Sequence, residues 1–149
     1  MKYLLALTLA CLPLPGLSDT MPVVERFIRD QARKTAGVEY KEARQLGRGD
    51  LNGDGKEDVA VLYTLEGFHG TNAYRQYLAV FSLVRSGLRQ RTHREVGGKG
   101  WRDVDMLAVA NGSIQLRTKE YADSDPSCCP SINGAVRLVL KGNRLKETK

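Results

Sequence analysis

Two short apolar runs constrain the fold of this 149-residue chain more than any other feature of its sequence. They occupy residues 59–63 (VAVLY) and 77–81 (YLAVF), and both are rich in β-branched and aromatic residues that favour strands. No polar residue alternates with the apolar ones, so both faces of each strand must be covered. The runs therefore predict two strands in the middle of a sheet.

The chain after residue 38 reads as a series of strands separated by turns. Asn111-Gly112 and Gly142-Asn143 are two-residue turn signals that demand positive φ and connect antiparallel neighbours. We predict strands at 39–48, 58–65, 74–85, 88–96, 102–110, 113–120, 135–141 and 144–148. The expected fold class is mainly β (α+β), with an antiparallel, meander-like sheet of about seven to eight strands.

Residues 20–36 predict one amphipathic helix before the sheet, because apolar residues recur there at three- and four-residue spacing. The apolar positions include Val24, Phe27, Ile28 and Ala32. Thr20 can cap this helix, Pro22 suits its first turn and Gly37 ends it. The simplest role of the helix is to cover one face of the sheet.

The first residues are typical of an export signal. Lys2 precedes an apolar run at 3–12, and small residues at 16 and 18 suit a signal peptidase. We expect cleavage after Ser18, which makes 1–18 a signal peptide and 19–149 a single domain of a periplasmic or secreted protein. Cys11 leaves with the signal, the alternative being that it is lipidated. No later apolar run approaches the roughly 20 residues needed to cross a bilayer.

An acidic, glycine-rich loop at 50–58 (DLNGDGKED) follows the first predicted strand. Side-chain oxygens fall at its relative positions 1, 3, 5 and 9, which are Asp50, Asn52, Asp54 and Asp58. Gly55 at position 6 permits a sharp turn, and the carbonyl of Lys56 at position 7 can face inward. This is the layout of a calcium loop, so Ca²⁺ is the expected cofactor. The alternatives are an acidic turn without an ion, and calcium that only staples the first two strands together.

The loop resembles the Asp-x-Asn-x-Asp-Gly-x-x-Asp calcium loops of integrin-type (FG-GAP) β-propellers and of related bacterial repeat modules. An EF-hand is excluded, because Val61 stands where that motif needs a glutamate and the flanks read as strands. The resemblance implies a propeller-like sheet, although propellers repeat the loop and here it occurs once. It also carries the metal ligands over onto this chain, as Asp50, Asn52, Asp54, Lys56 (through its carbonyl) and Asp58.

The adjacent cysteines lie in a second unusual segment, 125–131 (DPSCCPS). Cysteines in an oxidising compartment normally pair, but consecutive Cα atoms are about 3.8 Å apart, shorter than the roughly 4.4 Å lower end for disulfides. A vicinal Cys128–Cys129 disulfide, buried thiols and pairing with another molecule therefore stay open. The segment resembles an Asp-Pro-x-Cys-Cys-Pro-Ser element of small exported bacterial proteins, and the chain is loosely similar to periplasmic inhibitors of lysozyme-like enzymes. These resemblances imply export and a non-enzymatic role.

Other residues that could carry chemistry are few. His69 lies in a glycine-flanked surface loop, and His93 shares a strand face with two arginines, which predicts a solvated basic stripe. Asp103 and Asp105 lie on one strand face and could supply further calcium oxygens. Trp101 is expected to plug the core rather than to stand exposed. No nucleophile-elbow, zinc-protease or phosphate-loop motif occurs in the sequence.

The net charge of +6 favours acidic partners, such as an anionic envelope polymer or an acidic protein. Nucleic acid is disfavoured by export and by the lack of aromatic residues among the basic ones at 89–94. We therefore expect an exported, calcium-stabilised binding protein without catalytic activity. The alternative is an inhibitor or immunity protein that plugs the cleft of a peptidoglycan-cleaving, lysozyme-like hydrolase through the loop at 66–73 or 121–134.

Overall fold

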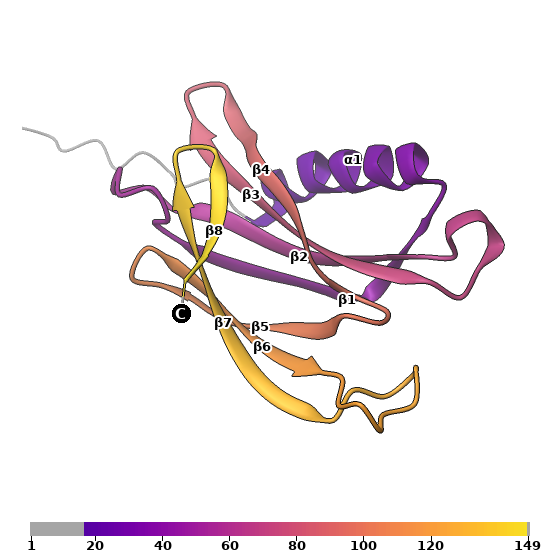
Figure 1. Ribbon diagram of the computed structural model, residues 1–149. Coiled ribbons are helices and arrows are strands. Elements are labelled where there is room, and N and C mark those ends of the chain that lie inside the picture. Colours follow the sequence, from indigo (N-terminus) through magenta and orange to yellow (C-terminus); the bar gives the residue numbers. More distant parts are fainter. Residues whose placement is uncertain (1–16, 149) are drawn as a thin grey trace, which may run out of the picture.

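The computed structural model describes residues 17–148, which form one helix and an antiparallel sheet whose strands follow chain order (Figure 1). The helix is α1 (Leu17–Thr35), and a short 3₁₀ turn, η1 (Phe68–Gly70), lies between β2 and β3. The strands are β1 (Val38–Gly49), β2 (Asp58–Glu66), β3 (Tyr74–Val84), β4 (Gly87–Gly98), β5 (Arg102–Ala110), β6 (Ser113–Glu120), β7 (Ile132–Lys141) and β8 (Arg144–Thr148). The predicted mainly β, meander-like fold class is confirmed.

The sheet is open and does not form a propeller. β4 and β5 pair only at Gly98 and Arg102, so β1–β4 and β5–β8 behave as two half-sheets that curl over one another (Figure 1). The propeller-like arrangement implied by the acidic loop is therefore wrong. A propeller needs separate four-stranded blades around an axis, whereas here every strand continues one meander.

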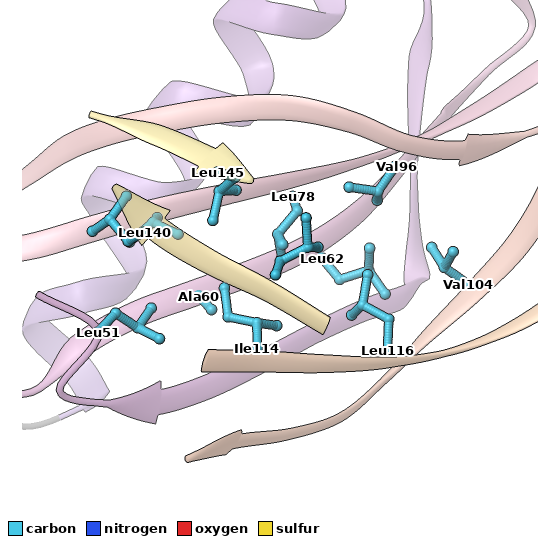
Figure 2. Close-up of a cluster of buried hydrophobic side chains, with 12 residues drawn as sticks. Leu51, Ala60, Leu62, Leu78, Val96, Val104, Ile114, Leu116, Leu140 and Leu145 are labelled. Carbon is cyan, nitrogen blue, oxygen red and sulfur yellow. The ribbon is translucent and has the colours of Figure 1, made fainter. Parts of the chain in front are cut away.

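Two apolar cores lie on the two faces of β2 and β3. Every residue of 59–63 and 77–81 is buried, as their composition predicts. The core under α1 contains Val24, Ile28, Val59, Val61, Tyr63, Leu65, Phe68, Tyr77, Ala79 and Phe81. The core between the half-sheets includes Leu51, Ala60, Leu62, Leu78, Val80, Val96, Val104, Ile114, Leu116, Leu138, Leu140 and Leu145 (Figure 2). The helix is thus one cover, and the C-terminal half-sheet is the other.

The helix differs from its prediction at both ends. It begins at Leu17, so Thr20 lies inside it rather than capping it. At the other end Ala36 takes the left-handed conformation, with φ 52°. Gly37 is needed for space instead, because a Cβ there would lie 2.9 Å from the Phe68 ring. No helix among the described residues is long and apolar enough to cross a membrane.

The predicted signal peptide, 1–18, lies outside the described residues except for its last two, which begin α1. Cys11 also lies outside them. The hairpin turns agree with their prediction: Asn111 and Gly112 have φ 51° and 68°, and Gly142 has φ 60°. The local signals for turns are therefore read correctly from the sequence.

Arg44 fastens α1 to β1. Its guanidinium donates to Glu25 on the helix at 2.6 Å and, through two nitrogens, to Glu39 on β1 at 2.7 Å each. The Arg44 side chain is 7% exposed and that of Glu39 is 10% exposed. A bulge in β1 between Tyr40 and Gln45 places Arg44 at this position. The Arg44 guanidinium holds the pKa of Glu25 below its ordinary value.

Candidate functional site

The acidic loop joins β1 to β2 and is curled by its own side chains. Asp50 Oδ1 accepts a hydrogen bond from the Gly53 N–H at 2.7 Å, and Asp50 Oδ2 accepts one from the Gly55 N–H at 2.8 Å. Gly53 and Gly55 both have φ 78°, a conformation that side chains disfavour. The Gly55 N–H, aided by neighbouring N–H groups, holds the pKa of Asp50 below its ordinary value. The predicted loop curl is therefore present.

Carboxylate oxygens from later ligand positions meet at the amide of Asn52. Asn52 Nδ2 lies 3.2 Å from Asp54 Oδ2 and 3.5 Å from Asp58 Oδ1. Asp58 is only 1% exposed, and its other oxygen accepts the Leu51 N–H at 2.9 Å. Two carboxylate oxygens thus face one positively polarised group, as they would face a cation between them.

The donor set of this loop suits a hard cation. Asp50, Asn52, Asp54, Asp58 and the carbonyl of Lys56 offer only oxygen, which calcium prefers. Across residues 17–148, no three carboxylate, imidazole or thiol groups gather closely enough to hold a metal by themselves. A calcium ion would therefore also depend on the Lys56 carbonyl and on rotation of the Asn52 amide to present its oxygen.

Asp103 and Asp105, which the sequence offered as possible further calcium ligands, lie away from this loop. Gly49, next to the loop, lies against Val109 near one end of β5, whereas Asp103 lies near the other end. Asp103 accepts the hydroxyl of Tyr74. Asp105 accepts Arg117 at 2.9 Å, and this guanidinium lowers the pKa of Asp105. Because β5 is extended, it carries Asp103 and Asp105 away from the acidic loop.

A groove of about 520 Å³ is lined by residues at the end of the half-sheets opposite the acidic loop. The groove begins where the core ends, because the strand positions that face the other half-sheet change there from apolar to polar. The last core positions are Leu62, Leu78 and Leu116, and the polar positions that follow are Thr64 and Glu66 on β2, Gln76 and Tyr74 on β3, and Thr118 on β6. Sequence reasoning missed this groove, although the shared switch in three strands was a readable signal.

The cysteine segment forms one wall of the groove. Cys128 and Cys129 are joined by a disulfide, and Cys128 lines the groove. Asp125 closes the segment, because its Oδ2 accepts the N–H groups of Ala122 and Ser131 at 2.8 Å each and the Ser131 hydroxyl at 3.0 Å. These hydrogen bonds give the Asp and Ser of the motif a structural role that the sequence analysis did not assign. The signal for it was the turn-forming Asp-Pro pair.

Tyr74 stands where the groove meets the two loops expected to bind a partner. Its hydroxyl donates to Asp103 and interacts with Tyr121, and burial raises the pKa of Tyr74. Tyr74 follows the loop at 66–73, and Tyr121 opens the segment at 121–134. Tyr121 in turn donates to the Ser127 carbonyl at 3.0 Å. Residues from both loops, Glu66 and Cys128, therefore border the groove together with Tyr74.

The remaining candidates lie apart from the groove. His93 is not part of a solvated stripe: its Nε2 lies 2.6 Å from the Tyr63 hydroxyl oxygen and its ring packs on Phe27 of α1, because the helix covers this face. His69 is exposed on the 3₁₀ turn. Trp101 is exposed rather than a core plug, with the Arg102 guanidinium 4.5 Å from its ring centre.

Comparison with protein-family models, with curated proteins and with solved structures finds no match to this chain. The architecture that the structure shows is one helix on an open, eight-stranded antiparallel sheet. The acidic loop and the groove are therefore the features of this chain that indicate a function.

Proposed function

We propose that this chain is an exported, calcium-stabilised binding protein without catalytic activity. The observation that carries the calcium assignment is the meeting of Asp54 and Asp58 oxygens at the Asn52 amide. An ion there offsets the repulsion between the carboxylates and stiffens the connection between β1 and β2. A Kd of roughly 10⁻⁴ to 10⁻³ M is sufficient for an extracellular site.

The side chains that line the groove are better suited to binding a ligand than to catalysing a reaction. Asp103 accepts from Tyr74, and Asp105 accepts from Arg117 and from Gln45 at 3.1 Å, so both carboxylates are already engaged. Cys128 is bonded to its neighbour. These contacts support a binding role. The disulfide and the apolar N-terminal run support export.

Inhibition of a peptidoglycan-cleaving, lysozyme-like hydrolase is a second candidate function. It is supported by the groove, because Glu66 of the loop at 66–73 and Cys128 of the segment at 121–134 both line it. A partner that enters the groove would therefore meet residues of both loops. The basic charge still favours an acidic partner, either a protein or an anionic envelope polymer.

Thermal unfolding of residues 19–149 tests the calcium assignment. We expect about 10 mM calcium to raise the melting temperature by about 4–10 °C over the value in chelator, because the ion binds only the folded loop. Asp54→Ala should lose this shift, whereas Asp123→Ala, an exposed acid outside the loop, should keep it. Identical melting curves with calcium and with chelator reject the assignment.

Capture from envelope extracts separates the two candidate functions. Recovery of anionic polymer supports the binding protein, whereas recovery of one hydrolase, followed by its inhibition in an assay on purified peptidoglycan, supports the inhibitor. Loss of hydrolase capture in Tyr121→Ala, with Trp101→Ala unaffected, would place the contact on the segment at 121–134.

A further inference from the structure

We propose that the groove at the open end of the half-sheets binds a neutral oligosaccharide. The inference rests on the proposed binding function and goes beyond it, because the ligand that it names is uncharged, unlike the acidic partner that the net charge of the whole chain favours. It does not depend on calcium, because the acidic loop lies at the opposite end of β1 and β2 (Figure 1). The volume of about 520 Å³ is within the range of small-ligand sites.

A buried hydroxyl in the groove lacks a partner. Thr118 is 1% exposed, lines the groove, and its Oγ1 forms no hydrogen bond within residues 17–148. A buried hydroxyl without a partner costs free energy, which a ligand hydroxyl can recover once the atoms that cover Thr118 Oγ1 move aside. Its cross-strand neighbour Gly134 is part of this arrangement, because a Cβ there would lie 2.7 Å from Thr118 Oγ1. An unsatisfied polar atom therefore lies just beneath the lining of the groove.

Opposite charges alternate along one side of the groove. Asp103 is directly opposite Lys119 in the β5–β6 ladder, and Asp105 is directly opposite Arg117. Each acid thus has a base beside it, and this side of the groove carries no net charge although the whole chain carries +6. A charged ligand gains little from such compensated pairs. A sugar hydroxyl, which both donates and accepts, can donate to a carboxylate and accept from the neighbouring cation.

Flat apolar surfaces complete the groove. Tyr40, on the exposed edge of β1, lines it and is 47% exposed. Cys128 and the core residue Val104 also line the groove. The C–H face of a sugar ring packs on an amphipathic tyrosine while its hydroxyls reach the polar groups around it. An exposed tyrosine beside paired donors and acceptors thus favours a saccharide over a lipid or an anion.

Calorimetric titration with three tetrasaccharides tests the assignment: maltotetraose, cellotetraose and the β-1,4-linked tetramer of N-acetylglucosamine, with tetra-alanine as the peptide comparator. We expect at least one tetrasaccharide to bind with Kd between about 10 µM and 1 mM. Tyr40→Ala should weaken that binding about tenfold. Leu107→Ala removes an apolar side chain that is 54% exposed but outside the groove, and it should change Kd less than about twofold.

Thr118→Val keeps the shape of the side chain and removes its hydroxyl. We expect it to weaken saccharide binding about fivefold while the melting temperature stays the same or rises, because the unpartnered hydroxyl is gone. The inference is overturned if no tetrasaccharide binds, if only tetra-alanine binds, or if Tyr40→Ala and Leu107→Ala have equal effects. Titrations in calcium and in chelator test the calcium site and the saccharide groove separately. Saccharide binding in chelator would support the groove assignment even if calcium did not raise the melting temperature.

Discussion

The side-chain amide of Gln76 on β3 forms two hydrogen bonds with the backbone of Val104 on β5, Nε2 donating to O at 3.0 Å and Oε1 accepting from N at 2.8 Å. The amide thus reproduces the pair of bonds that a neighbouring strand would supply. β5 needs it because its ladder to β4 is limited to Gly98 and Arg102. Gln76 therefore helps to hold the half-sheets together above the core at the point where the groove begins.

Gln76→Leu should destabilise the fold by about 2–3 kcal/mol, because it leaves the Val104 N–H and C=O without partners. Hydrogen exchange at the Val104 N–H should accelerate together with the drop in urea midpoint. The matched control is Gln90→Leu, an exposed glutamine on β4, which should leave both quantities unchanged. Unaltered exchange at Val104 in the Gln76 variant would show that the amide does not close the sheet.

Arg44→Ala should destabilise the fold by about 3–5 kcal/mol, because it leaves the carboxylate of Glu39 buried without its partner. Arg44→Lys should recover only part of this loss, since an ammonium cannot give Glu39 the paired bonds of a guanidinium. Arg33→Ala removes an exposed arginine of α1 that forms only a surface ion pair with Asp30, and it should cost less than about 0.5 kcal/mol. Equal urea midpoints for the Arg44 and Arg33 variants would contradict the anchoring role.

The sequence predicts the fold correctly where the pattern is local, or where a strand is apolar on both of its faces. The runs at 59–63 and 77–81 demand two covers, and the amphipathic segment after residue 20 supplies one of them. The second cover comes from β5–β8, and no local pattern says that a meander will curl back on itself. That curl depends on contacts far apart in the chain, such as Gln76 with Val104.

The candidate sites also differ in how far the sequence alone predicts them. The ligand positions of the acidic loop are close in sequence, so their spacing alone suggests their chemistry. The groove joins Tyr40, Thr118 and Cys128 from distant segments, and only the fold brings them together. His93 was misread because the alternation of its strand cannot reveal that Phe27 of the helix lies over it.

Asp125→Ala should loosen the cysteine segment without unfolding the domain. Its carboxylate holds Ala122 and Ser131 together, so both N–H groups should exchange faster and limited proteolysis should cut first within 121–131. Asp123→Ala, in the same segment, removes an exposed acid and should leave the cleavage rate unchanged. Equal cleavage rates in the two variants would mean that Asp125 does not organise this wall of the groove.

His93 should make stability depend on pH. Burial, aided by the positive charge of Lys34, lowers its pKa below the ordinary value of about 6.5. Burial raises the pKa of Tyr63, so its hydroxyl keeps its proton and can donate to the neutral Nε2 of His93. The ring also packs between Tyr77 and Phe27, where a charge is poorly solvated. Protonation is therefore harder in the folded chain than in the unfolded one.

The sign follows from this difference. The unfolded chain takes up a proton at His93 near pH 6.5 while the folded chain resists it, so stability is complete above that pH and falls as pH drops below it. Urea midpoints measured between about pH 7.5 and 5 should show this fall, above the range where most carboxylates titrate. His93→Gln should flatten the profile there, and His69→Gln, on the exposed turn, should not. A slope that persists in His93→Gln would assign the pH dependence to another group.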